Sequence, residues 1–139
     1  MPILSTFAHS DLPSAFSWQA IAYAALIRVT VFHAGTDYAI DGVGNVLTAT
    51  PYRGQGYGRQ VVERVNDRLD TSDADAAALF CAPDLEPFYA AAGWSPCPGG
   101  TRVDSHLYSE LRMMRMLSPR ARAAAKSLLT TTMDVGWAW

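Results

Sequence analysis

The residues between Val46 and Arg59, with the sequence VLTATPYRGQGYGR, combine an arginine with three alternating glycines, Gly54, Gly56 and Gly58. Glycine lets the backbone approach an anion closely and adopt positive φ. The apolar spacing that follows predicts a helix, whose first N–H groups and positive dipole end would face the same anion. The segment therefore predicts a phosphate cradle built mainly from backbone amides, in which added bulk at Gly56 or Gly58 does more harm than loss of a side chain.

Two common phosphate cradles do not fit this loop. A P-loop needs Lys and then Ser or Thr after its last glycine, and the dinucleotide fingerprint needs another glycine spacing and a later acidic residue. The pattern that remains is Arg/Gln-x-x-Gly-x-Gly/Ala, present as Arg53-Gly54-Gln55-Gly56-Tyr57-Gly58. It resembles the acetyl-CoA pyrophosphate loop of the GCN5-related N-acetyltransferases (GNAT). A glycine-rich structural turn in another α/β domain is the alternative.

A second block, from Ala76 to Trp94, adds to the resemblance. It reads as a strand, a loop and a short helix that ends in FYAAAGW, similar to the motif that the family has before its next strand. The resemblance extends over about residues 17 to 117. It implies an α/β fold in which helices flank a central mixed sheet of about five or six strands, with acetyl-CoA as the co-substrate.

The resemblance also assigns the cofactor contacts. It implies that the pyrophosphate is bound by Arg53, Gly54, Gln55, Gly56, Tyr57 and Gly58. Val46, Leu47 and Thr48 correspond to a strand end that separates from its neighbour, pairs with the pantetheine arm and directs an N–H toward the thioester carbonyl. Such a donor stabilises the oxyanion that forms when an amine attacks. The side chains of these three residues are equally compatible with an ordinary core strand.

Tyr89 takes the place, within FYAAAGW, of the tyrosine that acts as general acid in many family members. A phenol with a pKa of about 10 is roughly matched to a thiol with a pKa of about 8.5, so a positioned tyrosine can protonate the thiolate as the C–S bond breaks. The structural alternative is that Tyr89 only packs against the sheet.

The general base is less distinct. Among GNAT members, the aminoglycoside 2′-N-acetyltransferases resemble this chain most, through the segment from Ile21 to Ile27 and the later RGQ. The glutamate that they place on the cofactor-binding strand aligns with Gly44, which leaves Asp41, three residues upstream, as its substitute. An aspartate beside a glycine is also a common structural residue of turns.

The last residues, Met133-Asp134-Val135-Gly136-Trp137-Ala138-Trp139, offer acidic and aromatic groups. The aminoglycoside 2′ enzymes end in an acidic residue and a terminal tryptophan whose carboxylate helps to bind the cationic acceptor. The resemblance implies that Asp134 and Trp139 bind the acceptor amine through charge pairing and stacking. An ordered tail, packed on its own domain or on a neighbouring subunit, is the alternative.

These residues together predict an acetyl-CoA-dependent N-acetyltransferase that acts directly on a primary amine of a small molecule, such as an aminoglycoside. Direct transfer agrees with the lack of a convincing Cys-His pair in the sequence. One alternative is a noncatalytic acyl-CoA-binding module that keeps the cradle without a base or an acceptor pocket. Another is nucleic-acid binding through a basic segment that contains Arg112, Arg115, Arg120, Arg122 and Lys126.

The composition of the chain predicts its domain number, its location and the classes of partner that it does not bind. The chain has 139 residues, 50% of them apolar, and a formal net charge of −2. We expect one domain over residues 1–139, without general attraction to nucleic acid or membranes. The sequence has no membrane-length apolar run and no signal-peptide pattern, which predicts a cytoplasmic protein. Cys81 and Cys97 are expected as buried free thiols rather than a disulfide, and the spacing of the histidines predicts no metal site.

Periodicity predicts the elements that carry these residues. We expect an extended or short-helical lead-in to residue 16, one or two strands over 17–32, and an extended run over 38–50 with a turn or bulge at 41–44. A helix with Val61, Val62, Val65 and Leu69 on one face follows. The remaining expected elements are a strand over 76–81, a helix from Asp84 to Gly93, strands near 103–107 and 111–117, and a helix from Ser118 to about Leu129.

The segment that resembles the family begins close to the start of this sequence. Family members usually place a strand and two helices before the part that corresponds to Ser17 onward, where only sixteen residues stand here. We therefore expect a shortened and altered acceptor side. Apolar surface left bare by the missing elements would favour a homodimer, because large exposed apolar patches bind partners.

Overall fold

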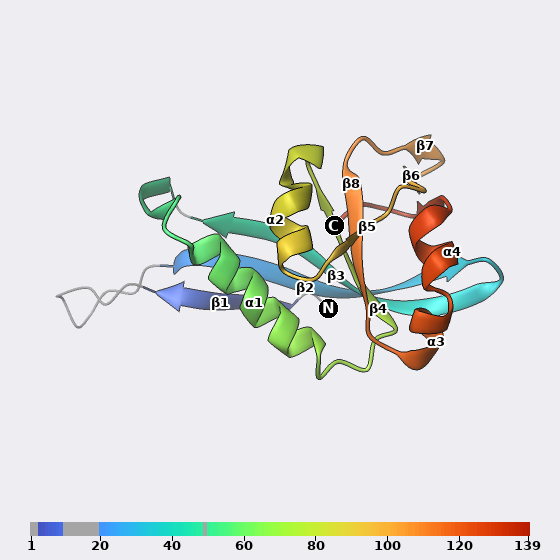
Figure 1. The fold of residues 1–139 in the computed structure, drawn as a ribbon, viewed down its shortest axis with the longest axis horizontal. Helices are drawn as coiled ribbons and strands as arrows, with labels where there is room; N and C mark the ends of the chain where they lie inside the picture. Colours follow the sequence, from blue (N-terminus) through green and yellow to red (C-terminus); the bar gives the residue numbers. More distant parts are fainter. Residues whose placement is uncertain (1–2, 10–19, 49) are drawn as a thin grey trace.

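The structure is a computed structural model that describes residues 3–9, 20–48 and 50–139 (Figure 1). Its strands are β1 (Ile3–His9), β2 (Ala20–His33), β3 (Thr36–Thr48), β4 (Ala76–Cys81), β5 (Ser95–Pro96), β6 (Thr101–Val103), β7 (His106–Leu107), β8 (Leu111–Met116) and β9 (Met133–Val135). Its helices are α1 (Tyr57–Leu69), α2 (Glu86–Ala91), α3 (Pro119–Ala123) and α4 (Ala125–Thr130), and its 3-10 turns are η1 (Thr50–Tyr52) and η2 (Pro83–Leu85).

Six strands form a mixed sheet in the order β1-β2-β3-β4-β8-β5, which confirms the predicted architecture. β3 and β4 pair in parallel, and the other neighbouring strands run antiparallel. α1 and α2 pack on one face of this sheet, and α3 and α4 pack on the other (Figure 1). A second sheet, in the order β7-β6-β9, is not predicted by the sequence.

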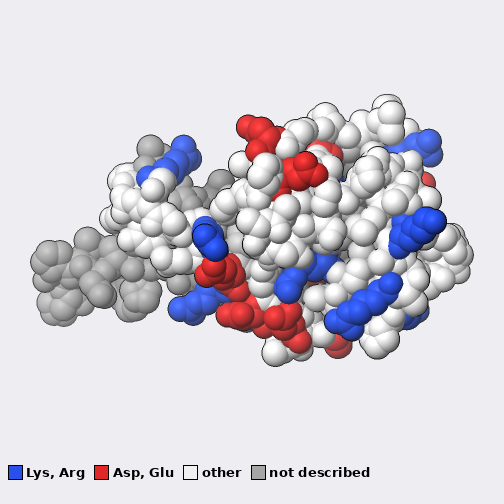
Figure 2. All heavy atoms as spheres, viewed as in Figure 1, with Lys and Arg blue, Asp and Glu red and all other residues white. Residues whose placement is uncertain are grey.

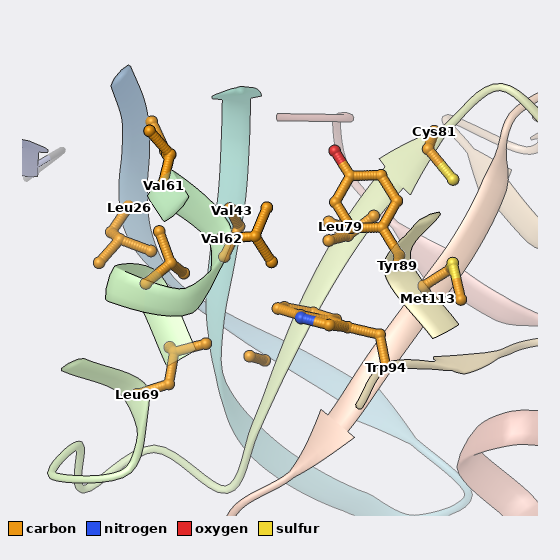
Figure 3. Close-up of a cluster of buried hydrophobic side chains, with 13 residues drawn as sticks. Leu26, Val43, Val61, Val62, Leu69, Leu79, Cys81, Tyr89, Trp94 and Met113 are labelled. Carbon is orange, nitrogen blue, oxygen red and sulfur yellow. The ribbon is translucent and has the colours of Figure 1, made fainter. Parts of the chain in front are cut away.

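The helix α1 covers the sheet through the apolar stripe that the sequence predicts. Four of its side chains are at most 2% exposed and pack with sheet residues in one cluster (Figure 3): Val61, Val62, Val65 and Leu69. Burial of each such side chain contributes about 1.5–3 kcal/mol. Because only a short segment joins β3 to α1, this packing also fixes the start of α1 close to the end of β3.

The opposite face of the sheet is covered by elements that follow β8. Ile40 and Met114 from the sheet, Leu128 from α4 and Met133 from β9 are fully buried in a second cluster.

Four details differ from the predicted elements. β3 runs unbroken through Gly42 and Gly44, because these glycines make room for a side chain rather than for a turn. Asp84 lies inside η2 and caps no helix. β6 and β7 form a hairpin in place of one strand, with positive φ at Asp104 and Ser105, whose short polar side chains tolerate that conformation. The final helix is divided into α3 and α4.

The basic segment considered for nucleic-acid binding does not form one exposed surface. Arg112 is fully buried, and its guanidinium donates hydrogen bonds to backbone carbonyl oxygens. Arg115 and Arg120 form ion pairs with Asp70 and Asp75. Figure 2 shows the basic side chains on the right of this face separated from one another by uncharged surface. This distribution does not favour binding to a phosphate backbone.

Asp75, just before β4, ties the central strand to two other segments. Its carboxylate accepts hydrogen bonds from the Ala39 N–H at 2.9 Å, from the Ser118 hydroxyl at 2.8 Å and from the Arg120 guanidinium at 2.7 and 2.9 Å. Ser118 also caps α3, as the sequence predicts. The hydrogen bonds from Arg120 are the main reason that the pKa of Asp75 lies well below its usual range, although burial opposes them.

We expect Asp75→Asn to lower the free energy of unfolding by about 2–3 kcal/mol near pH 7, because an amide cannot replace the carboxylate that Arg120 binds. The folded-state pKa of Asp75 is depressed, so its stabilisation is fully present above the unfolded-state pKa of about 4 and is lost progressively as the pH falls from that value toward the lower folded-state pKa. Urea unfolding of both proteins from about pH 7 down to about pH 3 measures the effect. The difference between the two free energies should begin to shrink below about pH 4, and a difference that stays constant down to about pH 3 would contradict this account.

Asp73→Asn is the matched control for this substitution. The Asp73 side chain is 90% exposed and forms its ion pair with Arg28 at the surface. We expect this variant to keep the stability of the parent within about 0.5 kcal/mol.

Candidate functional site

β3 and β4 separate partway along their length. Their parallel pairing ends at Val43 and Leu79. β3 continues to Thr48 paired with β2, and its register includes an extra residue, a β-bulge, between Gly44 and Leu47. Among the described strands, none pairs with this part of β3 on the side of β4. An unpaired strand edge of this kind can form backbone hydrogen bonds with an extended ligand.

A cavity of about 350 Å³ lies where the two strands separate. Its walls come from β3, from β4 and the turn after it, and from three residues of other segments: Tyr89, Glu110 and Trp139. Val46, Tyr89 and Trp139, which the sequence analysis places in the site, thus line one space. Polar and apolar atoms both contribute to its lining.

The glycine loop lies between the end of β3 and the start of α1. Gly54 and Gly56 have φ values of 78° and 85°, and α1 begins at Tyr57 without a side-chain cap. Its first N–H groups therefore have no partner within the helix. A Cβ atom at Gly54 or Gly56 would meet no other atom within 4 Å, so the loop surface is open. Positive-φ backbone that leads into an open helix N-terminus is a geometry that binds phosphate.

Tyr89 reaches the cavity from α2. The residue is 6% exposed, and its ring packs in the cluster with Leu79 while its hydroxyl points away from Trp94, toward the space between β3 and β4 (Figure 3). Burial raises the pKa of Tyr89 from 10.0 to about 12. The phenol therefore stays protonated at neutral pH and can donate a hydrogen bond. Complete proton transfer to a thiolate is less favourable than it is for a phenol with a pKa of about 10.

Acidic side chains gather over η2 and α2, near the top of the view (Figure 2). Glu110 lines the cavity, and Asp84 and Glu86 lie on η2 and α2 beside it. Burial, together with the charges of these three carboxylates, raises the pKa of the Cys81 thiol to about 11. Cys81 is a buried free thiol, as predicted, and it is uncharged and a poor nucleophile at neutral pH. The negative rim favours a cationic ligand.

Trp139 closes the inner end of the cavity. Its indole N–H donates a hydrogen bond of 3.0 Å to the carbonyl oxygen of Ala78, and its ring centroid lies 4.9 Å from that of Phe80. A Cβ atom on Gly42 would stand 2.7 Å from the indole, and one on Gly44 would stand 3.1 Å from the carbonyl carbon of Trp139. β3 therefore needs glycine at both positions to accommodate this tryptophan.

Asp41, the predicted base, lies in a different place. Its carboxylate pairs with Arg28 at 2.6 Å and accepts a hydrogen bond from Ser72, and Arg28 also pairs with Asp73 at 2.7 Å. These residues line a separate cavity of about 450 Å³ beside the C-terminal end of α1. The structure thus does not bring Asp41 into the cavity that contains Tyr89, and its polar partners give it a clear structural role.

Asp134, on β9, borders a groove rather than the cavity. The groove has a volume of about 430 Å³ and is also lined by Phe32, Trp137 and Trp139. The rings of Trp137 and Trp139 meet edge to face, with centroids 6.3 Å apart. Because Trp139 lines both the groove and the cavity, the two spaces share one wall.

Glu110 is the cavity residue that sequence reasoning misses. It stands alone in the segment before β8, so no local motif marks it, and only the pairing of β8 with β4 brings it to the cavity. Within the described ranges, no three His, Cys, Asp or Glu side chains are grouped closely enough to hold a metal ion. No helix in these ranges is long and apolar enough to cross a membrane.

Comparison with known proteins gives matches among solved structures. No protein-family model matches the sequence, and no curated protein matches it. YhbS from Escherichia coli, a GNAT family N-acetyltransferase in complex with CoA, is 23% identical, with a TM-score of 0.59 over 84% of this chain. An acyl-CoA N-acyltransferase from Pseudomonas aeruginosa is 25% identical, with a TM-score of 0.50 over 70% of this chain. A mutant AtaT toxin, bound to the C-terminus of the antitoxin AtaR and to acetyl-CoA, is 14% identical, with a TM-score of 0.58 over 76% of this chain.

This chain spans only part of each of these proteins, namely 60% of the first, 60% of the second and 64% of the third. None of the three is named as an aminoglycoside 2′-N-acetyltransferase. At such identities the likeness is one of fold. The protein therefore has the mixed α/β fold of the GNAT N-acetyltransferases.

Proposed function

We propose that the protein transfers an acetyl group from acetyl-CoA directly to a primary amine of a small molecule. One observation carries the proposal: Tyr89 and the unpaired edge of β3 border the cavity between β3 and β4, and the glycine loop and the open N-terminus of α1 follow β3 in the chain. Proteins of the same fold bind CoA or acetyl-CoA. The pyrophosphate of CoA requires N–H donors such as those at the N-terminus of α1, and its pantetheine arm requires a strand edge such as that of β3.

The loop holds the pyrophosphate in this proposal. The contacts come from the backbone of Arg53, Gly54, Gln55, Gly56, Tyr57 and Gly58. The pantetheine arm pairs with the free edge of β3 at Val46, Leu47 and Thr48, and the thioester reaches the cavity. A backbone N–H beside the β-bulge then faces the thioester oxygen, where negative charge develops during attack.

The chemical step follows from the groups in the cavity. The bound ammonium group first gives one proton to water, and the neutral amine nitrogen then forms a bond to the thioester carbon. The C–S bond breaks, the sulfur leaves with the electron pair, and the nitrogen loses its second proton to water. Tyr89 donates a hydrogen bond to this sulfur as charge develops; its proton completes the free thiol, and water returns a proton to the phenol. Because the pKa of Tyr89 is raised to about 12, hydrogen bonding in the transition state is the larger part of its effect.

The acceptor binds where acidic and aromatic groups meet. Glu110, at the rim of the cavity, attracts the ammonium group that is to react. Asp134 and the indoles of Trp137 and Trp139 bind further cationic or apolar parts of the same molecule in the adjoining groove. An aminoglycoside-like polyamine fits both sites and is the first acceptor to test.

A noncatalytic acyl-CoA-binding module is the second candidate. The observation that favours it is the position of Asp41, which is bound by Arg28 and leaves the cavity without the predicted base. Turnover with an amine separates the two candidates. A cytoplasmic location and a homodimer stay predictions, and sedimentation velocity measures the latter.

Tyr89→Phe should reduce kcat by about 100-fold while the Kd for acetyl-CoA stays within about twofold, because the lost hydroxyl acts on the leaving sulfur. Steady-state kinetics and calorimetry measure the two effects. Tyr38→Phe is the matched control, since Tyr38 is 7% exposed and packs in the cluster on the opposite face of the sheet. Equal kcat values for parent and Tyr89→Phe would remove Tyr89 from the mechanism.

Gly56→Ala should raise the Kd for acetyl-CoA by at least about tenfold, because the φ of 85° disfavours alanine and the added methyl group faces the phosphate. Gly35→Ala is a matched control. Gly35 has a φ of 81° and, like Gly56, no atom within 4 Å of an added Cβ, but it lies in the turn between β2 and β3. Both variants should lose similar stability by urea unfolding. Equal affinity of the two for acetyl-CoA would argue against the loop as the phosphate site.

Glu110→Gln should raise KM for the amine by about three- to tenfold and change kcat less, because it removes attraction for the cation before the chemical step. The same assay on Glu63→Gln, an exposed carboxylate on α1, should give parent values. An unchanged KM for Glu110→Gln, with an increase in Asp134→Asn, would move the reacting amine from the rim to the groove.

A further inference from the structure

We propose that the indole of Trp139 sets the length of the acyl group that the protein accepts. The inference rests on the proposed function, because it concerns the inner end of the same cavity. It assigns to this side chain a specificity that separates short acyl-CoA donors from long ones.

The position of the indole carries the proposal. It lies over Gly42 and is hydrogen-bonded to the carbonyl oxygen of Ala78. Gly42 and Ala78 are paired residues of β3 and β4, one position before the last pair of the parallel ladder. An acyl group that enters between the separating strands advances toward this closed end. It therefore meets the flat face or edge of the indole rather than open space.

The indole is held firmly enough to act as a wall. The hydrogen bond from its Nε1 to the carbonyl oxygen of Ala78 is 3.0 Å long, and its ring centroid lies 4.9 Å from that of Phe80. β3 carries glycine at both positions that face Trp139, so the strand is shaped to this side chain. An acyl chain can displace the indole only by breaking the hydrogen bond and the ring contact together.

On the other side of the Trp139 indole from the cavity lies the groove that Asp134 and Trp137 line. Trp139 lines this groove of about 430 Å³ as well as the cavity of about 350 Å³. Removal of the indole would join the two spaces and give a longer acyl chain a partly apolar path toward β2 and β9. Removal of the neighbouring indole, Trp137, would enlarge the groove alone, because Trp137 does not line the cavity.

The test measures the Kd of acetyl-, butyryl-, hexanoyl- and octanoyl-CoA for the whole chain by calorimetry, with free CoA as the reference and without an acceptor. For the parent, we expect affinity relative to free CoA to fall by at least about tenfold from acetyl to hexanoyl, because the longer chain finds no apolar space. For Trp139→Ala, we expect the order to reverse, with about fourfold tighter binding for each added methylene that enters the freed space.

Two further variants keep the test decisive. Trp139→Phe retains a ring beside Phe80 while it removes the hydrogen bond and part of the volume, so its preferred chain length should lie between those of the parent and Trp139→Ala. It carries the test if Trp139→Ala does not fold. Trp137→Ala should keep the chain-length preference of the parent.

The outcomes separate this inference from the proposed function. If all variants bind acetyl-CoA and both Trp139 variants keep the parent's preference, the inference is overturned and the acetyl-CoA site stands. A shift of equal size in Trp137→Ala also overturns it, because the effect would then come from the groove. If the parent binds no CoA thioester, the proposed function fails and the inference fails with it.

Discussion

The separation of β3 and β4 is the constraint on which the rest of the structure depends. Parallel strands normally satisfy each other's backbone groups along their whole length, and buried groups without partners destabilise a fold. Here the pairing ends at Val43 and Leu79, and a β-bulge in β3 follows. The open edge is tolerated because it faces a cavity that solvent or a ligand can enter. Each functional feature of the molecule is then placed relative to this opening.

Different elements cover the two faces of the sheet near the opening between β3 and β4. On one face, α2 brings Tyr89 to its border, and α1, which follows the glycine loop, packs in the same cluster. On the other, the segment after β8 folds back, so that β9 and Trp139 cover the inner end. Gly42 and Gly44 on β3 contact Trp139 at the end of the sequence. Larger residues at these two positions would leave no room for this tryptophan. A local feature of β3 thus depends on a contact with residues far along the sequence.

Local patterns were sufficient to predict most of the sheet, the helix α1 and the glycine loop that precedes it. The apolar period of α1 and the apolar run of β4 are properties of short segments, and the glycine loop combines backbone requirements that are visible in sequence. The residues whose surroundings differ from the prediction depend on distant partners. Glycines at 42 and 44 have the appearance of a turn until Trp139 is placed over them. Asp41 has the appearance of a base until Arg28 is paired with it.

Burial explains why the pKa of Tyr89 differs from the value that its residue type alone predicts. The residue type alone predicts a phenol with an ordinary pKa, whereas its place in the cluster raises the pKa of Tyr89 to about 12. Glu110 has no motif at all, and it becomes a candidate only because the segment before β8 lies at the rim. The chemistry of this site is therefore set by packing around the opening as much as by the side chains themselves.

The most direct test of the account is an NMR titration of backbone amides with acetyl-CoA, because it locates the ligand. The account predicts shift changes concentrated at Gly44 and Val46 on β3 and at Gly56 and Tyr57 at the start of α1, with little change at Arg28. Changes centred on Arg28 and its neighbours, or no changes at millimolar ligand, would contradict the claim that the opening between β3 and β4 is an acyl-CoA site.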